Sequence, residues 1–158
     1  MPGVSENSEF DFIVAGAGSA GCVLANRLSE SGRHSVLLIE AGGPANNINL
    51  KIPLMVAKIL NDERYTWQYQ TEPQSHLNDK PQRWVRGRVI GGSGSINGNL
   101  FVRGDPKEYD DWRDAGCTGW GYADMLPYFK RLEDYPQGDP AVRGRSGPIH
   151  CTNLDRFD

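Results

Sequence analysis

The chain has 158 residues, a formal net charge of −3 and 38% hydrophobic residues. This length is enough for one hydrophobic core, and the weak negative charge offers no basic surface for nucleic acid. No apolar run approaches the roughly 20 residues that a membrane-spanning helix requires. The composition therefore predicts a globular domain and argues against nucleic-acid binding and a transmembrane segment.

The N-terminal stretch and the cysteines bear on location. Residues 1–9 are polar, lack the basic-then-apolar order of a secretion signal, and are predicted to be disordered. Cys22, Cys117 and Cys151 are odd in number and form no CxxC pair, which favours free thiols and a reducing, cytoplasmic location. Cys22 falls on the first predicted helix, where it is expected to be buried.

The first glycine-rich loop, GAGSAG at residues 16–21, follows an apolar strand at residues 10–15 and opens a helix. Gly16 permits a tight turn, Gly18 lets the main chain approach a phosphate, and Gly21 lets the helix pack against the strand. A strand, loop and helix in this order are typical of a dinucleotide-binding fold, with the pyrophosphate at the helix N-terminus.

A second strand at residues 35–39 ends at Glu40, nineteen residues after Gly21. In a βαβ unit, a carboxylate at this point accepts hydrogen bonds from the adenosine ribose hydroxyls. It also disfavours a 2′-phosphate, so the pattern favours FAD or NAD over NADP. A glycine-rich turn that binds nothing is the alternative, but here both strands, the helix and the terminal acid are all in place.

Two elements are predicted between the glycine-rich loops. Residues 47–60 are predicted to contain a short helix that begins at Pro53, with its apolar stripe in the core. Residues 67–71 and 82–86 alternate large and polar side chains, and they are predicted to pair as strands across a polar turn.

The C-terminal third is predicted to hold two helices and a loop. Residues 106–115 form a helix with Asp105 as its N-cap, and residues 122–134 form a second helix with one apolar side. Residues 136–147 are rich in proline, glycine and aspartate and predict a mobile loop. Residues 147–150 are predicted to begin a strand.

The second glycine-rich loop, GRVIGGSGSING at residues 87–98, has no place in a plain nicotinamide-binding domain. Gly91 and Gly92 lack side chains, so their backbone can lie against a flat isoalloxazine ring or a phosphate. Ser93, Ser95 and Asn97 supply small hydrogen-bonding groups at a predicted helix start. The two loops together predict a flavin.

Several motifs are specific enough to suggest a family. Residues 87–97 read Gly-Arg-x-Ile-Gly-Gly-Ser-Gly-x-Ile-Asn, followed by Phe101, Gly104 and Asp110. This pattern resembles the first signature of the glucose–methanol–choline (GMC) oxidoreductases, which are FAD-dependent enzymes that oxidise alcohols. The resemblance extends from residue 10 to residue 148 and is greatest to the choline-dehydrogenase-like branch. The motifs that extend it lie at residues 15–25, 38–43, 67–73, 102–104 and 119–120.

The resemblance implies an α/β fold: the N-terminal part of a Rossmann-like FAD-binding domain, incomplete without downstream sequence. The FAD-binding region would span residues 10–134, and residues 135–158 would form a loop and the start of the connection to a substrate domain. Ile96 replaces a histidine that some relatives link covalently to the flavin, so FAD is expected to be non-covalent. The predicted cofactor-binding residues are Gly16, Gly18, Ser19, Ala20, Gly21, Glu40, Ala41, Gly91, Gly92, Ser93, Asn97, Gly98, Asn99 and Leu100.

No catalytic residue and no metal site are predicted in this chain. GMC enzymes are several times longer, and their catalytic histidine, with a second histidine or an asparagine, lies near their C-terminus. His34, His76 and His150 do not match that position. The chain is therefore expected to be either a truncated record or one piece of a split enzyme completed by a second chain. A βαβ half-unit with an exposed parallel edge is not expected to be a stable monomer.

The resemblance implies alcohol oxidation in which a histidine from the remaining part takes the hydroxyl proton and a hydride passes to flavin N5. The sequence favours neither oxygen nor a quinone-like acceptor, and it does not specify the alcohol. The alternatives are a GMC-type hydroxynitrile lyase, a fatty acid photodecarboxylase and a non-catalytic nucleotide-binding subunit. A plain NAD-dependent dehydrogenase ranks last because it leaves the second glycine-rich loop unexplained.

Overall fold

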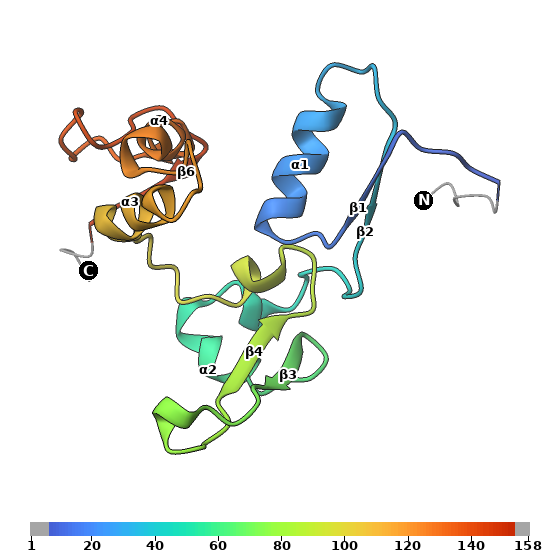
Figure 1. Cartoon of the computed structure of the whole chain (residues 1–158). Helices are drawn as coiled ribbons and strands as arrows, with labels where there is room; N and C mark the ends of the chain where they lie inside the picture. The colour runs from blue at the N-terminus through green and yellow to red at the C-terminus, as the bar shows by residue number, and fades with distance from the viewer. Residues whose placement is uncertain (1–6, 154–158) are drawn as a thin grey trace. The chain divides into compact units, whose positions relative to one another are not determined.

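The computed structural model describes residues 7–153, and it divides into two compact units, Met1–Leu100 and Phe101–Asp158 (Figure 1). The first six residues of the predicted disordered stretch 1–9 lie outside the described residues, as do the last five of the predicted connection 135–158. No helix among residues 7–153 is long and apolar enough to cross a membrane.

The first unit begins with the predicted βαβ arrangement. Strand β1 (Phe12–Ala15) leads into helix α1 (Ser19–Ser29), and strand β2 (Val36–Ile39) pairs with β1 in parallel. The register sets Phe12 opposite Val36 and Ala15 opposite Ile39. Both strands therefore finish at the same edge, where the first glycine-rich loop and Glu40 follow them.

The expectation that Cys22 is buried is wrong. Its side chain is exposed, and α1 has no buried residue. Ile13 on β1 and Ile39 on β2 are also 64% and 49% exposed. One helix and two strands leave most of their surface without a packing partner, so an apolar or small side chain on this helix is not covered.

The predicted helix around residues 53–60 is broken into short pieces. The segment consists of the 3₁₀ turns η1 (Ile48–Leu50) and η2 (Pro53–Met55) and the short helix α2 (Val56–Ile59). The expectation of a core stripe holds only in part, because Ile59 is 2% exposed whereas Leu54 is 90% exposed. A helix of this length presents one side chain, not a stripe, to the core.

The predicted strand pair is confirmed. Strands β3 (Thr66–Gln70) and β4 (Arg83–Gly87) form an antiparallel hairpin, and its connection contains the 3₁₀ turn η3 (Ser75–Leu77). Strand β4 runs directly into the second glycine-rich loop. The hairpin therefore positions the start of that loop.

The second unit contains both predicted C-terminal helices. Helix α3 (Pro106–Asp114) has the expected N-cap, because the Asp105 carboxylate accepts the N–H of Lys107 at 2.8 Å. Helix α4 (Tyr122–Leu132) ends before the predicted residue 134. The next residues form strand β5 (Glu133–Asp134), which pairs in parallel with the predicted strand, β6 (Ile149–His150).

Candidate nucleotide site

The first glycine-rich loop turns sharply between β1 and α1. Gly16 has a φ of 97°, a conformation that side-chain-bearing residues rarely adopt, and its N–H donates to the Ile39 carbonyl at 2.7 Å. Helix α1 begins at Ser19 with Gly18 as its N-cap and with no side-chain cap. The first N–H groups of the helix therefore have no helical or side-chain acceptor and can receive an anion.

Gly21 is glycine for a steric reason. A Cβ atom at this position would lie 1.9 Å from the Gly16 carbonyl oxygen and 3.3 Å from a Val14 methyl group. The first turn of α1 therefore packs directly on the end of β1. Ser19 and Ala20, which lie between these glycines, are exposed.

Glu40 follows β2 and binds two main-chain N–H groups. Its Oε2 accepts from Ala17 at 2.7 Å, and its Oε1 accepts from Gly42 at 2.8 Å. A carboxylate oxygen has two lone pairs, so each oxygen can still accept a hydroxyl hydrogen bond. Ala41, the next predicted site residue, is exposed.

The second glycine-rich loop packs against the first. Gly91 and Gly92 have φ angles of 94° and 56°. The Gly91 N–H donates to the Ala17 carbonyl at 2.7 Å, and an added Cβ at Gly92 would lie 2.8 Å from the Gly18 Cα. The expected helix start is only one 3₁₀ turn, η4 (Gly92–Ser95). The structure thus brings together the two loops that the sequence separates.

Most polar side chains of the second loop bind the loop itself. Ser93 Oγ accepts the Gly87 N–H at 3.0 Å, and Ser95 Oγ donates to the Ile90 carbonyl at 2.9 Å. The Asn97 side-chain oxygen accepts the Asn99 N–H at 2.9 Å. The amide NH₂ of Asn97 and the Ser93 hydroxyl hydrogen remain able to donate to a ligand. The last predicted residues of the loop, Gly98, Asn99 and Leu100, are exposed.

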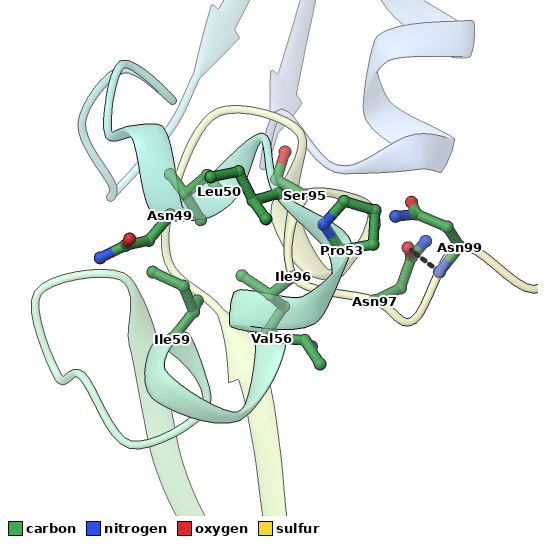
Figure 2. Close-up of a pocket in the computed structure, with 11 residues that line it drawn as sticks. Asn49, Leu50, Pro53, Val56, Ile59, Ser95, Ile96, Asn97 and Asn99 are labelled. Carbon is green, nitrogen blue, oxygen red and sulfur yellow. Dashed lines mark hydrogen bonds between the residues drawn. The ribbon is translucent and has the colours of Figure 1, made fainter. Parts of the chain in front are cut away.

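The second loop and the segment 49–59 line a small pocket of about 60 Å³, and the predicted site residues Asn97 and Asn99 are among its lining residues (Figure 2). Ile59 and Ile96 both line the pocket, and together with Val89 they form the buried core of the first unit. A pocket of this volume holds about two water molecules.

Ala17 is the residue that sequence reasoning missed. It is 3% exposed, and both its N–H and its carbonyl are bound, to Glu40 and to Gly91. The Cys22 thiol also donates to the same carbonyl at 3.3 Å. The alanine side chain gives no sign of this role in the sequence, because the hydrogen bonds are made by the main chain of Ala17.

Arg86, just before the second loop, and Arg88, its second residue, do not form ion pairs within residues 7–153. The Arg86 guanidinium lies 4.7 Å from the centre of the Trp84 ring, and that of Arg88 lies 4.6 Å from the centre of the Trp67 ring. These cation–π contacts orient both charges on the hairpin.

Within the described part of the first unit, no hydrogen bond or ring contact joins His34 or His76 to the glycine-rich loops. His34 packs edge-on against the Phe12 ring at 5.2 Å, and His76 lies in η3. His150 in the second unit pairs with the Asp134 carboxylate at 3.0 Å.

Comparison with protein families gives a match to the GMC oxidoreductase model, which covers residues 10–156. The chain belongs to the GMC oxidoreductase family. The family signature and the choline-dehydrogenase-like resemblance predicted from the sequence are confirmed.

Curated GMC relatives are similar over most of this chain. An oxygen-dependent choline dehydrogenase from Photobacterium profundum is 46% identical over 147 residues, which is 93% of this chain and 26% of the relative. The corresponding protein from Vibrio vulnificus is 47% identical over 140 residues, 89% of this chain and 25% of its own length. The chain thus spans about a quarter of the length of these relatives.

Solved GMC structures confirm the predicted fold class. Pyridoxine 4-oxidase from Mesorbium loti superposes with a TM-score of 0.81 at 36% identity, over 90% of this chain and 28% of that one. A formate oxidase variant from Aspergillus oryzae, solved for its effect on FAD modification, gives a TM-score of 0.77 at 29% identity, over 93% and 27%.

Proposed function

We propose that this chain is the FAD-binding part of a larger GMC enzyme that oxidises alcohols. One observation carries the proposal: the two glycine-rich loops meet, within the first unit, at the N-terminus of α1 and beside Glu40. A flavin dinucleotide explains this arrangement if its pyrophosphate lies where the loops meet and its flavin half continues along the second loop, whereas a nicotinamide site leaves the second loop without a role. The similarity to choline dehydrogenases supports the same conclusion.

The residues present fit a dinucleotide. A Cβ atom at Gly16 or Gly98 would meet nothing within 4 Å, so both positions border open space that a ligand can fill. The free N–H groups at the start of α1 would hold the pyrophosphate. Glu40 would accept the ribose hydroxyls while it keeps its two main-chain donors. Residues 91–100 would lie along the flavin.

Bound FAD would supply the acceptor for the hydride that leaves the alcohol carbon. The residues of this chain would bind and orient that cofactor. They would not remove the hydroxyl proton, because the resemblance places the catalytic histidine near the C-terminus of GMC enzymes, a position that His34, His76 and His150 do not match. We assign the catalytic base to the part of the enzyme beyond this chain.

A non-covalent flavin is part of the proposal. Ile96 occupies the position of the linking histidine, and its hydrocarbon side chain is 6% exposed in the core with Ile59 and Val89. Acid precipitation of the enzyme should therefore leave yellow FAD in the supernatant. A pellet that stays yellow after extensive washing would show a covalent bond and contradict this part. We also propose a cytoplasmic location, which the three free thiols support.

The proposal is tested on the full-length protein. We expect the protein to show a flavin absorption spectrum, and we expect choline to reduce and bleach that flavin in the absence of oxygen. The reason is the similarity of the chain to choline dehydrogenases. Glu40→Ala should lower the flavin-to-protein ratio, because loss of the acceptor for buried hydroxyls costs about 1–3 kcal/mol, or roughly tenfold in affinity. A protein that binds NAD but no FAD would overturn the proposal. A bound flavin that no alcohol bleaches would leave a non-catalytic subunit as the better account.

A further inference from the structure

The main chain of Ala17 connects the first glycine-rich loop to Glu40 and to the second loop. The Ala17 N–H donates to the Glu40 carboxylate at 2.7 Å, and the Ala17 carbonyl accepts the Gly91 N–H at 2.7 Å. Ala17 is buried, so neither bond competes freely with water. Ala17 directly precedes Gly18, the N-cap of α1. A shift of Ala17 therefore shifts the N–H groups that would hold a pyrophosphate.

A backbone contact reinforces these bonds. Gly92 has a φ of 56°, and a Cβ atom there would lie 2.8 Å from the Gly18 Cα. In return, a Cβ atom at Gly18 would lie 3.9 Å from the Gly92 Cα. The second loop thus lies against the first with no side chain between them. Any side chain at position 92 must move the Gly18 backbone or strain its own.

The other side of the second loop is held at the end of β2. The Ile90 N–H donates to the Gly43 carbonyl at 2.9 Å, and Val89 forms a parallel bridge with Gly43. Glu40 closes the ring, because one carboxylate oxygen binds Ala17 and the other binds the Gly42 N–H. An unbroken series of hydrogen bonds therefore connects the segment after β2 to the second loop, and the second loop to the first.

We propose that Glu40 and Gly92 are positioning residues that set the conformation of the first glycine-rich loop. Gly92 acts through Gly18, and Glu40 acts through Ala17 in addition to its proposed contact with the ribose. The inference rests on the proposed dinucleotide function and deepens it. Its consequence is that the second loop controls binding of the ADP half of the cofactor, which carries no flavin ring.

Binding of ADP and FAD to the full-length apoprotein tests the role of Gly92. Gly92→Ala should raise the dissociation constants of both ligands by a similar factor, roughly tenfold or more. Gly43→Ala is the matched control, because its Cβ would meet nothing within 4 Å and its φ is not positive; both constants should stay within about twofold. If Gly92→Ala weakens FAD but leaves ADP at the wild-type affinity, Gly92 contacts the flavin directly and the proposal is wrong.

Hydrogen exchange without nucleotide tests the role of Glu40. Glu40→Gln keeps the size of the side chain, but its NH₂ group would face a main-chain N–H at Ala17 or Gly42. We expect the Gly91 amide to exchange roughly tenfold faster in this variant, because its acceptor residue, Ala17, is no longer held by Glu40. Unchanged exchange would overturn the proposal. If the wild-type protein bound neither ADP nor FAD, the proposed function would fail while this experiment still decided the coupling of the loops.

Discussion

Each of the two units of this chain is stabilised internally by a different kind of contact. In the first unit, the nucleotide loops meet through main-chain hydrogen bonds and glycine contacts around Ala17. In the second unit, the Glu133 carboxylate is fully buried and accepts from Arg103 at 2.8 Å and from Arg143 at 3.1 Å. The glycine-rich loops, which lack side chains, leave space for a ligand. The side chains of Glu133 and its two arginines leave none, because they fill the space between them.

The surroundings of Glu133 also consist of side-chain contacts, unlike the main-chain contacts of the first unit. The Arg103 guanidinium lies 5.3 Å from the centre of the Phe129 ring, and Phe129 packs against Tyr109 at 5.6 Å. Aromatic and charged side chains thus carry the packing of this unit. We therefore expect the second unit to be sensitive to side-chain deletion and the first to be sensitive to side-chain addition.

The largest effect should follow removal of the buried carboxylate. Glu133→Ala leaves Arg103, whose side chain is 8% exposed, without its ionic partner. Breaking a buried ion pair from one side costs about 3–5 kcal/mol of the free energy of unfolding. Urea denaturation of the full-length protein measures it. Arg143→Ala is the control and should cost less, because that side chain is 35% exposed. A Glu133→Ala loss no greater than that of the control would remove the contrast between the units.

Addition of one methyl group tests the first unit. A Cβ at Gly42 would lie 2.2 Å from the Arg88 main chain, whereas one at Gly43 would meet nothing within 4 Å. Gly42→Ala should cost about 1–3 kcal/mol through overpacking. Gly43→Ala, the adjacent control, should stay within about 0.5 kcal/mol of the wild type. Equal unfolding midpoints for the two variants would contradict the close packing of the second loop on the end of β2.

A smaller, pH-dependent effect is expected at the start of β1. The Asp11 carboxylate accepts the Ser35 N–H at 2.7 Å and the Ser35 hydroxyl at 2.9 Å. These bonds, the main-chain one first, lower the pKa of Asp11 from its ordinary value of 3.8. The carboxylate therefore stabilises the fold above pH 3.8, and this contribution is lost as the pH falls below 3.8 through the folded-state pKa.

Asp11→Asn measures that contribution. The variant should unfold at a lower temperature than the wild type near pH 7, and the difference should shrink at about pH 3. A difference that is constant over this range would mean that the charge of Asp11 plays no part. The result would show whether a side-chain carboxylate also contributes to the unit that main-chain contacts dominate.

The smallest effect is a difference in thiol reactivity. Burial, and then the nearby Glu133 charge, raise the pKa of the Cys151 thiol, whereas Cys22 and Cys117 are exposed. Iodoacetamide at about pH 8 should therefore modify Cys151 last, because the thiolate is the reactive form. Mass spectrometry of peptides over time provides the rates, and labelling in urea is the control. Equal rates for all three cysteines in the folded protein would contradict the environment of Cys151.

Much of the fold followed from local sequence signals. The first βαβ unit, the hairpin of β3 and β4, and helices α3 and α4 all lie within a few residues of their predicted ranges. Helix α4 ends earlier than predicted because Glu133 is extended, with φ −103° and ψ 140°, and binds two arginines. No local pattern could show that, since Arg103 is thirty residues away in the chain.

The sequence by itself determined the family and the presence of two glycine-rich loops. Glycine spacing, the acid at position 40 and the turn residues are local features, so they can be recognised without coordinates. Only the tertiary structure decided that the loops meet at Ala17, that Cys22 is exposed and that Glu40 binds two main-chain N–H groups. The contact between the loops joins main-chain atoms far apart in the chain, and the Glu40 carboxylate also binds main-chain groups, which are the same for almost every residue type. Their pairing is therefore set by the packing of strands and loops and leaves no pattern in the side chains.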